Sequence, residues 1–195
     1  MSEFVRSYME RMKQGLDRID RQTIEEITDV LLNAWKNNRQ VFILGNGGSA
    51  SLASHFACDL GKGTLSRHYD RTEKRFRVIS LTDNSALISA YANDLGYEDI
   101  FAQQLNNLVK SGDVVIGISG SGNSINVIKA IELASACNAT TIAFLGFDGG
   151  KLKGLVDRYV IFPEHHYGRV EDFHLMLVHM ICEELSRRIR EHKPK

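Results

Sequence analysis

The chain has 195 residues, of which 43% are hydrophobic and 25% are charged, and its formal net charge at pH 7 is zero. This composition is typical of one globular domain and excludes a disordered chain. A balanced charge argues against nucleic acid as a partner, because phosphate backbones are bound by basic surfaces. The sequence contains no apolar run of the length that crosses a membrane.

The N-terminal segment and the cysteines together predict a cytoplasmic protein. The segment MSEFVRSYMERMKQGLDR is charged throughout and lacks the apolar core of a secretory signal. Cys58, Cys137 and Cys182 are odd in number and far apart, and each lies in an apolar or helical context. We therefore expect three reduced thiols in the protein core, although Cys58 lies beside Asp59 and a reactive role stays open.

Residues 3–37 are predicted to form two consecutive helices. Apolar residues recur there at helical spacing, as in Ile24, Ile27, Val30 and Leu31. The first helix has no neighbouring strand in the sequence. Residues 1–38 are therefore expected to be a helical extension that packs on a neighbouring subunit or covers one side of the domain.

Short apolar runs and helical patterns alternate through the rest of the chain. The predicted strands are 41–45, 76–82, 113–119, 140–146 and 159–163, and the predicted helices between and after them are 49–60, 84–92, 98–110, 123–137 and about 170–191. Alternation of this kind predicts a mainly parallel sheet of the α/β class, and nearly continuous apolar strands indicate helices on both faces. Ligands of such sheets bind beyond the carboxyl ends of the strands.

Two turns rich in glycine and serine follow predicted strands and precede predicted helices. The first is Gly45-Asn46-Gly47-Gly48-Ser49, and the second is Ser119-Gly120-Ser121-Gly122-Asn123-Ser124. Glycine N–H groups, serine hydroxyls and a helix N-terminus together suit a phosphate monoester, although such turns can also serve only as helix caps. Neither turn matches a nucleotide-binding motif, which favours a small phosphorylated metabolite as the ligand.

His55 and Asp59 are four residues apart on the predicted helix 49–60 and therefore face the same way. Imidazole and carboxylate groups suit zinc, but two ligands alone do not make a site. The pair could equally transfer protons, or Asp59 could pair with a nearby lysine.

Four segments together resemble a known family. They are GNGGSxxxxxHF at 45–56, Asn93-Asp94 before a glycine–aromatic pair, GISGSGNS at 117–124, and Glu171-Asp172-x-His174-x4-His179. In the same order along nearly the whole chain, they resemble a SIS (sugar isomerase) domain and, more narrowly, the phosphoheptose isomerases. The resemblance implies one SIS domain over residues 1–195, a three-layer α/β/α sandwich with a five-stranded parallel sheet, and a homotetramer with active sites at subunit interfaces.

The resemblance also implies an activity and a set of site residues. The activity is conversion of sedoheptulose 7-phosphate to D-glycero-D-manno-heptose 7-phosphate, and several members of the family bind zinc. The residues at the matching positions fall into three groups: Ser119, Gly120, Ser121 and Ser124 for the phosphate; Asn46, Gly47, Gly48, Ser49, Asn93, Asp94 and Glu171 for the substrate; and His55, Asp59, Glu171 and His179 for metal binding and catalysis.

The sequence departs from the family at two of these positions. Asp59 stands where the family usually has glutamate, and Glu171 stands where it usually has glutamine. A shorter acid changes the reach of a base or ligand, and the added charge of Glu171 should favour a divalent cation. Substrate identity is the implication that these changes weaken most.

Glu171 and His179 present a problem of spacing. Within one helix, eight residues correspond to about 12 Å of rise, too far for both to bind one metal directly. Residue 171 could precede the helix, the two ligands could come from different subunits, or one of them could be absent from the site. His174 is three residues from Glu171 and could be a further ligand or a core residue.

Aldose–ketose isomerisation moves a proton between C1 and C2 through an enediol. Asp59 is predicted to be the base and His179 its acid–base partner. Zinc or another divalent cation is predicted to polarise the carbonyl. The alternative is a non-catalytic SIS protein, either an adaptor that binds a replication initiator or a sugar-phosphate sensor. The presence of Asp59 together with His179 favours the enzyme.

Overall fold

The computed structural model describes residues 2–66 and 70–191. The strands within this part of the chain are β1 (Gln40–Gly45), β2 (Arg77–Ser80), β3 (Val114–Ser119), β4 (Thr140–Gly146) and β5 (Arg158–Phe162). The α-helices are α1 (Glu3–Asp17), α2 (Arg21–Lys36), α3 (Gly48–Cys58), α4 (Ser85–Asp94), α5 (Ile100–Leu108), α6 (Ile125–Ala136) and α7 (Tyr167–Glu191). Three short turns complete the set: the π-helix η1 (Asp59–Gly63) and the 3₁₀-helices η2 (Tyr97–Asp99) and η3 (Leu152–Gly154).

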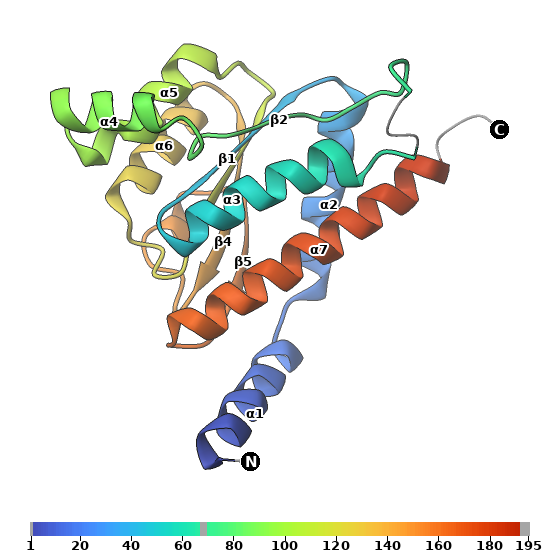
Figure 1. Ribbon diagram of the computed structural model, residues 1–195, viewed down its shortest axis with the longest axis vertical. Coiled ribbons are helices and arrows are strands. Elements are labelled where there is room, and N and C mark those ends of the chain that lie inside the picture. Colours follow the sequence, from blue (N-terminus) through green and yellow to red (C-terminus); the bar gives the residue numbers. More distant parts are fainter. Residues whose placement is uncertain (1, 67–69, 192–195) are drawn as a thin grey trace.

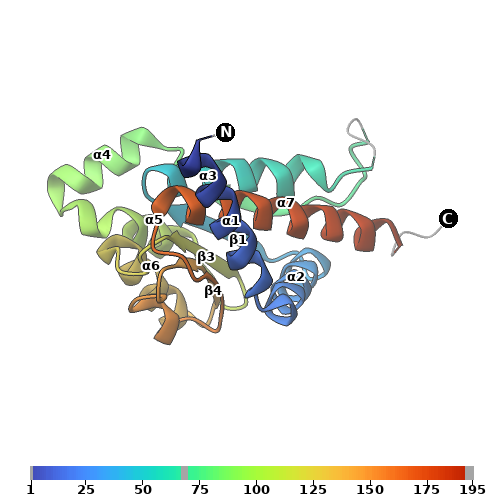
Figure 2. The same cartoon turned by 90° about the horizontal axis from the view of Figure 1, so that it is seen from below.

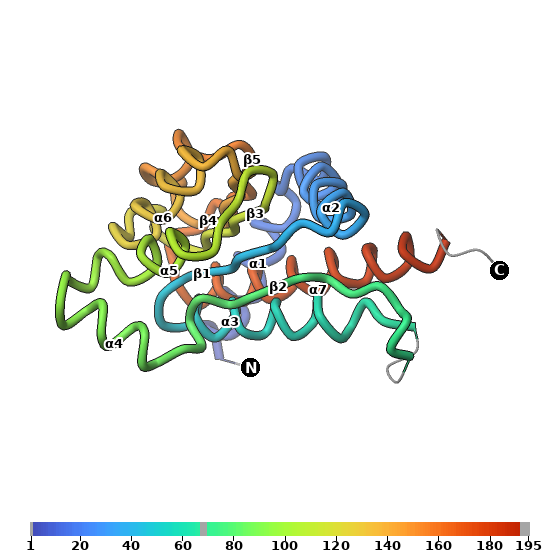
Figure 3. Tube along the Cα trace, turned by 90° about the horizontal axis from the view of Figure 1, so that it is seen from above, coloured from blue at the N-terminus to red at the C-terminus, as the bar shows by residue number. Residues whose placement is uncertain are grey.

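The five strands form one parallel sheet in the order β2-β1-β3-β4-β5. Side chains alternate across it, so each strand contributes to two cores. Val41 and Ile43 pack in a core with α2, α3 and α7, whereas Phe42 and Leu44 pack in a second core with α5 and α6. Figure 3 shows α3 and α7 on one side of the sheet and α5 and α6 on the other. The predicted three-layer α/β/α sandwich is confirmed.

The chain leaves β1 and β3 toward opposite faces of the sheet. These strands are neighbours, with Gly45 level with Ile118 near their carboxyl ends. β1 continues into α3, which packs in the first core, and β3 continues into α6, which packs in the second. Such a divergence opens a crevice at the carboxyl end of the sheet, where α/β proteins bind ligands. Both glycine–serine turns lie at this crevice.

Several predicted boundaries were wrong in ways that affect the site. The predicted helix 49–60 is α-helical only to Cys58 and then widens into η1, so Asp59 begins a π-turn. The last helix begins at Tyr167 rather than near 170, which puts Glu171 inside α7. The helix predicted to end at 92 continues to Asp94, so Asn93 and Asp94 form its last residues.

Helix α1 extends away from the sheet (Figure 1). It meets the first part of α7, where the Tyr8 hydroxyl donates a 2.5 Å hydrogen bond to the Asp172 carboxylate (Figure 2). The apolar side chains of Phe4 and Met9 are 70% and 62% exposed. The prediction that residues 1–38 pack on a neighbouring subunit therefore stays open, with an apolar surface available for it.

Two further observations bear on the sequence predictions. The expectation of three core thiols was wrong for Cys58, which is exposed, and Cys137 is only partly buried, whereas Cys182 is buried. Cys58 is the last residue of α3, directly before η1, and its side chain faces away from the core. In residues 2–66 and 70–191, no helix combines the length and apolar character needed to cross a membrane.

Candidate active site

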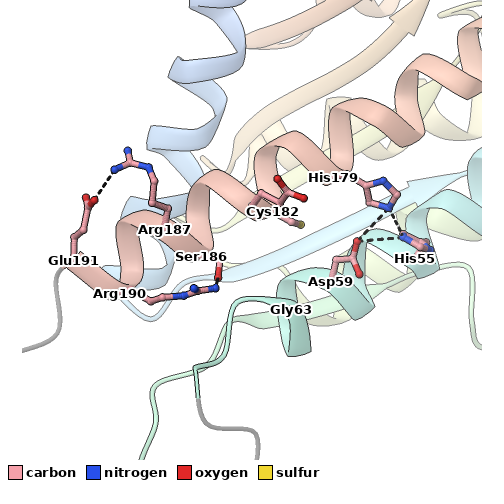
Figure 4. A pocket seen from close by; sticks show the side chains of 10 residues that line it. His55, Asp59, Gly63, His179, Cys182, Ser186, Arg187, Arg190 and Glu191 are labelled. Carbon is pink, nitrogen blue, oxygen red and sulfur yellow. Dashed lines mark hydrogen bonds and ion pairs between the residues drawn. The ribbon is translucent and has the colours of Figure 1, made fainter.

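His55, Asp59 and His179 form a compact cluster between two helices. The His55 Nε2 atom lies 3.0 Å from the His179 Nε2 atom and 3.2 Å from Oδ2 of Asp59. The same carboxylate oxygen is 3.8 Å from Nε2 of His179. In Figure 4 the two imidazoles and the carboxylate point toward one another, and all three side chains are partly exposed. The predicted convergence of these residues is therefore present within one chain.

The local helix geometry explains how the cluster forms. His55 lies in the last turn of α3, and Asp59 follows one turn later where the backbone passes into η1. π-turns inside helices occur frequently at functional sites, because the wider turn redirects a side chain. His179 lies in the middle of α7, which runs beside α3 (Figure 1). Phe56 and Val178, next in sequence to the two histidines, are fully buried in the same core, which anchors both helices on this face of the sheet.

The cluster lies at the border of two pockets, and His55 lines both. A cavity of about 730 Å³ contains all three residues and continues along the C-terminal half of α7 (Figure 4). A smaller pocket of about 280 Å³ lies on the other side of His55, against the first glycine turn, and contains Gly48, Ser49 and Glu171. Part of the predicted substrate wall therefore adjoins the cluster through the side chain of His55.

Glu171 lies against the N-terminus of α3. A methyl group placed on Gly48 would come within 2.7 Å of the Glu171 carboxylate, so the carboxylate closely approaches the backbone at this position. Because Glu171 is inside α7, the idea that it precedes the helix was wrong. The three-residue group is the one that could hold a metal within the described ranges 2–66 and 70–191, and Glu171 is not part of it. Its metal role stays a prediction, whereas its position in the smaller pocket suits substrate contact.

The serine turn is ordered by its own side chains. Gly122 N–H donates to the Ser119 hydroxyl at 3.2 Å, and that hydroxyl lies 3.3 Å from the Ser124 hydroxyl. Asn123 N–H donates to the Ser121 hydroxyl at 3.2 Å. Ser124 is the N-cap of α6, but its side chain makes no capping hydrogen bond. The turn thus presents hydroxyls and a helix N-terminus at the crevice, an arrangement that suits an anion.

Asn93 and Asp94 are exposed at the end of α4, where the Asn93 amide donates to the Asp94 carboxylate at 2.7 Å. Three residues later, the Tyr97 hydroxyl donates to the Asn46 side-chain oxygen at 3.1 Å. This contact brings the segment after α4 to the first glycine turn. The substrate role of Asn93 and Asp94 stays a prediction.

Two residues near the cluster have other roles. His174 is fully buried, and its Nε2–H donates to the carbonyl of Leu145 at 3.0 Å, so it is a core histidine rather than a ligand. Cys182, predicted as a reduced core thiol, is buried but also lines the larger cavity one turn after His179, a position that was not predicted from the sequence. Burial, assisted by the nearby Asp59 carboxylate, raises the pKa of the Cys182 thiol, which keeps it protonated.

His174 should make the protein sensitive to mild acid. Burial lowers its pKa to about 4 from an ordinary value of 6.5, because protonating the ring would place a charge in the core. The unfolded chain takes up this proton below about pH 6.5 and the folded chain only near pH 4, so the free energy of unfolding falls as the pH drops through this window. Between pH 7 and pH 4.5 the loss should be about 2–3 kcal/mol.

Urea unfolding of the wild type and of His174→Gln at both pH values measures this contribution. Glutamine can still donate to the Leu145 carbonyl but does not titrate, so the variant should lack that part of the acid-induced loss. All other titrating groups are common to both proteins. Equal losses in the two proteins would show that His174 does not titrate as its burial requires.

Comparison with known proteins identifies the family. A family model described as SIS domain matches residues 3–146. The phosphoheptose isomerase of Helicobacter pylori strain P12 is 36% identical over 181 residues, which cover 93% of this chain and 91% of that protein. The chain belongs to the SIS-domain phosphoheptose isomerase family. The phosphoheptose isomerase of Trichlorobacter lovleyi is 38% identical over 160 residues, which are 82% of this chain and 79% of that one.

Solved structures agree with this membership of the phosphoheptose isomerase family. The phosphoheptose isomerase of Neisseria gonorrhoeae superposes with a TM-score of 0.84 at 27% identity, covering 94% of this chain and 95% of that one. The NanR protein of Vibrio vulnificus, solved in complex with ManNAc-6P, is only 16% identical with a TM-score of 0.66 and therefore shows likeness in fold alone. The predictions of this family and of an isomerase enzyme are confirmed, and a non-catalytic SIS protein is not favoured.

Sequence reasoning missed two residues that support the first glycine turn. One is Tyr97, described above. The other is Asn126, whose side-chain amide pairs with that of Asn46. A polar residue among the apolar side chains at the start of α6 was the available signal, because a buried amide needs a partner.

Proposed function

We propose that the protein isomerises sedoheptulose 7-phosphate to D-glycero-D-manno-heptose 7-phosphate. The observation that carries the proposal is the meeting of Asp59 with two imidazoles at the mouth of a cavity of about 730 Å³. Transfer of a proton between two carbons requires a base near the carbon and neighbouring groups that can donate and accept protons, and the carboxylate with its two imidazoles provides both. The phosphoheptose isomerase relatives support the choice of a ketose phosphate as substrate.

Asp59 is proposed to move the carbon-bound proton. Its Oδ2 atom faces both imidazoles, which leaves Oδ1 to approach the sugar. Oδ1 would take the proton from C1 of the ketose, the C1–H electrons would form the C1–C2 double bond of the enediol, and Asp59 would return the proton to C2. His179 would move a proton between the C1 and C2 oxygens, so that the carbonyl ends at C1. Atoms and charge balance without a co-substrate.

The same three residues fit a zinc ion or another divalent cation. Their candidate ligand atoms, two imidazole nitrogens and one carboxylate oxygen, all lie within 4.8 Å of one another, and this donor set is one that zinc prefers. A bound cation would supply Lewis-acid stabilisation of negative charge on the sugar oxygens. Asp59 can serve as ligand and base at once if it uses one oxygen for each role.

The phosphate is proposed to bind at the serine turn, with Ser119, Gly120, Ser121 and Ser124 around it. The support is the pair of Ser119 and Ser124 hydroxyls, 3.3 Å apart at the N-terminus of α6, together with the Ser121 hydroxyl in the same turn. Asn46, Gly47, Gly48 and Ser49 are proposed to line the sugar from the side of β1. Glu171, which shares the smaller pocket with Gly48, is proposed to contact a sugar hydroxyl.

We further propose a cytoplasmic homotetramer with its active sites at subunit interfaces. The support is the exposed apolar surface of α1 and α7, which includes Phe4, Met9, Leu175 and Met180. Contiguous apolar patches on soluble proteins commonly mark interfaces. Light scattering of the purified protein measures the assembly directly.

The activity is tested by incubating the purified protein with sedoheptulose 7-phosphate, with and without zinc, and following the aldose by NMR. We expect heptose 7-phosphate to accumulate to equilibrium. A parallel screen of other ketose phosphates separates the two parts of the proposal. Turnover of another ketose phosphate would correct only the substrate, whereas no turnover of any, in folded and metal-loaded protein, would overturn the isomerase.

A further inference from the structure

The side-chain amides of Asn46 and Asn126 form a reciprocal pair. Asn46 Nδ2 donates to Asn126 Oδ1 at 2.8 Å, and Asn126 Nδ2 donates to Asn46 Oδ1 at 2.9 Å. Asn126 is only 3% exposed, and its oxygen also accepts from the N–H of Val127 at 2.9 Å. These contacts hold its amide in one orientation. Each oxygen has a second donor, but the Nδ2 group of the buried Asn126 donates only to Asn46, so breaking the pair would leave that buried donor without its partner.

The pair joins the two sides of the crevice. Asn46 belongs to the turn after β1, which leads to α3, whereas Asn126 lies in the first turn of α6, directly after the serine turn. The two helices cover opposite faces of the sheet, so their N-termini diverge at this point. The amide pair is therefore a direct side-chain link between the two turns, across the place where the ligand is expected.

The link also includes the segment after α4. Tyr97 donates to the same Asn46 oxygen, which then accepts two hydrogen bonds. Lys129, one turn after Asn126 on α6, holds the neighbouring η2 through Glu98 at 2.7 Å and Asp99 at 3.1 Å. The start of α6 thus continues directly from the serine turn. It contacts the first glycine turn through Asn126 and η2 through Lys129.

The contacts of Asn46 limit what its side chain can do for a substrate. Both lone pairs of its oxygen are engaged, and one of its two amide hydrogens points at Asn126. The side chain therefore links the two turns and keeps one amide hydrogen with which it can still contact the sugar. Gly47 and Gly48, which follow it and are exposed, are the part of this turn that offers backbone N–H groups to a ligand.

We propose that Asn126 is a positioning residue that sets the distance between the first glycine turn and the serine turn. This inference rests on the proposed function, in which one turn holds the sugar and the other its phosphate. A substrate bound by both turns needs them in fixed register, and a displacement of about 1 Å can cost on the order of 100-fold in rate. Asn126 acts through Asn46 and does not itself touch the substrate.

Kinetics of Asn126→Ala, Asn126→Asp, Asn46→Ala and the double alanine variant test the proposal. Asn126→Ala should lower kcat/KM by about 10- to 100-fold, mainly by raising KM, because binding across both turns is what is lost. Asn126→Asp keeps the acceptor for Asn46 but sets a second, charged acceptor against the Asn46 oxygen in a buried site, so it should not recover this loss. The double variant should be no worse than the more damaged single variant, because both remove the same link.

Gln104→Ala is the matched control. Gln104 is also 3% exposed and uses its amide to hold the carbonyls of Leu81 and Ile100, on the same side of the sheet as α6. It should destabilise the protein without raising KM. A KM increase in this control equal to that of Asn126→Ala, or additive effects of Asn46→Ala and Asn126→Ala, would overturn the proposal.

Hydrogen exchange gives a readout that does not depend on activity. The amides of Ala50 and Ser51, which donate to the Gly47 carbonyl at 3.0 and 3.2 Å, should exchange at least about tenfold faster in Asn126→Ala than in the wild type, and should be unchanged in Gln104→Ala. Unchanged exchange in both variants would reject the link between the turns. If exchange is faster in Asn126→Ala but the wild type turns over no sugar phosphate, the link between the turns is retained and the proposed function is rejected.

Discussion

Asp59→Asn is expected to lower kcat for the ketose phosphate by about 10²- to 10⁴-fold. The amide has the shape of the carboxylate and can still contact the imidazoles of His55 and His179, but it cannot accept the proton from C1. The direct measurement is exchange of the C1 proton with solvent D2O, followed by NMR. This exchange reports enediol formation and should fall together with kcat.

Two further variants distinguish the loss of a catalytic base from the loss of a negative charge in the cavity. Glu183→Gln removes a carboxylate that lines the same cavity but lies outside the cluster, and it should keep most of the activity. Asp59→Glu keeps a carboxylate and should retain far more activity than Asp59→Asn. Because Asp59 is also a proposed ligand, all rates are compared at saturating zinc. C1 exchange within about tenfold of the wild type in folded, metal-loaded Asp59→Asn would reject Asp59 as the base.

Loss of the metal is the second large effect expected. Elemental analysis of the purified wild type should find about one divalent ion per chain, and His55→Ala should retain little of it, because the remaining two ligands of the cluster cannot replace an imidazole. Competition with a zinc indicator measures the affinity without any assay of activity.

His165→Ala is the control for the metal experiment. His165 stacks on Phe147 with the ring centroids 5.2 Å apart and is not a member of the cluster, so its loss should leave the metal in place. Glu171→Ala decides the remaining question about the ligands. Retained metal would assign Glu171 to the substrate, and lost metal would mean that Glu171 completes the site. Undiminished metal in His55→Ala would reject the cluster as the binding site.

Much of the fold and part of the site could be predicted from local patterns. Apolar runs such as VFILG at 41–45 become buried strands because burial on both faces requires continuous apolar side chains. His55 and Asp59 meet because four residues are one helical turn, and their contact at 3.2 Å is set within that turn. The positions of both glycine–serine turns follow in the same way from the ends of β1 and β3.

Other features of the site depend on the tertiary structure. His179 is 124 residues from His55, yet packing of α7 beside α3 brings their Nε2 atoms to 3.0 Å. The spacing of eight residues showed that Glu171 and His179 are far apart on one helix, but only the structure decided which of them joins His55. The burial of His174 and the π-turn at Asp59 were likewise not encoded in any local pattern.

The division has one physical reason. Hydrogen bonding within a helix and alternation along a strand are local, so the sequence by itself determined the elements, the family and most candidate residues. Contacts between elements depend on how helices pack across the sheet, which is set by the shapes of many side chains together. The sequence therefore determined that His55 and Asp59 share a helix face, and only the tertiary structure decided that His179 completes the cluster and that Asn126 links the two turns.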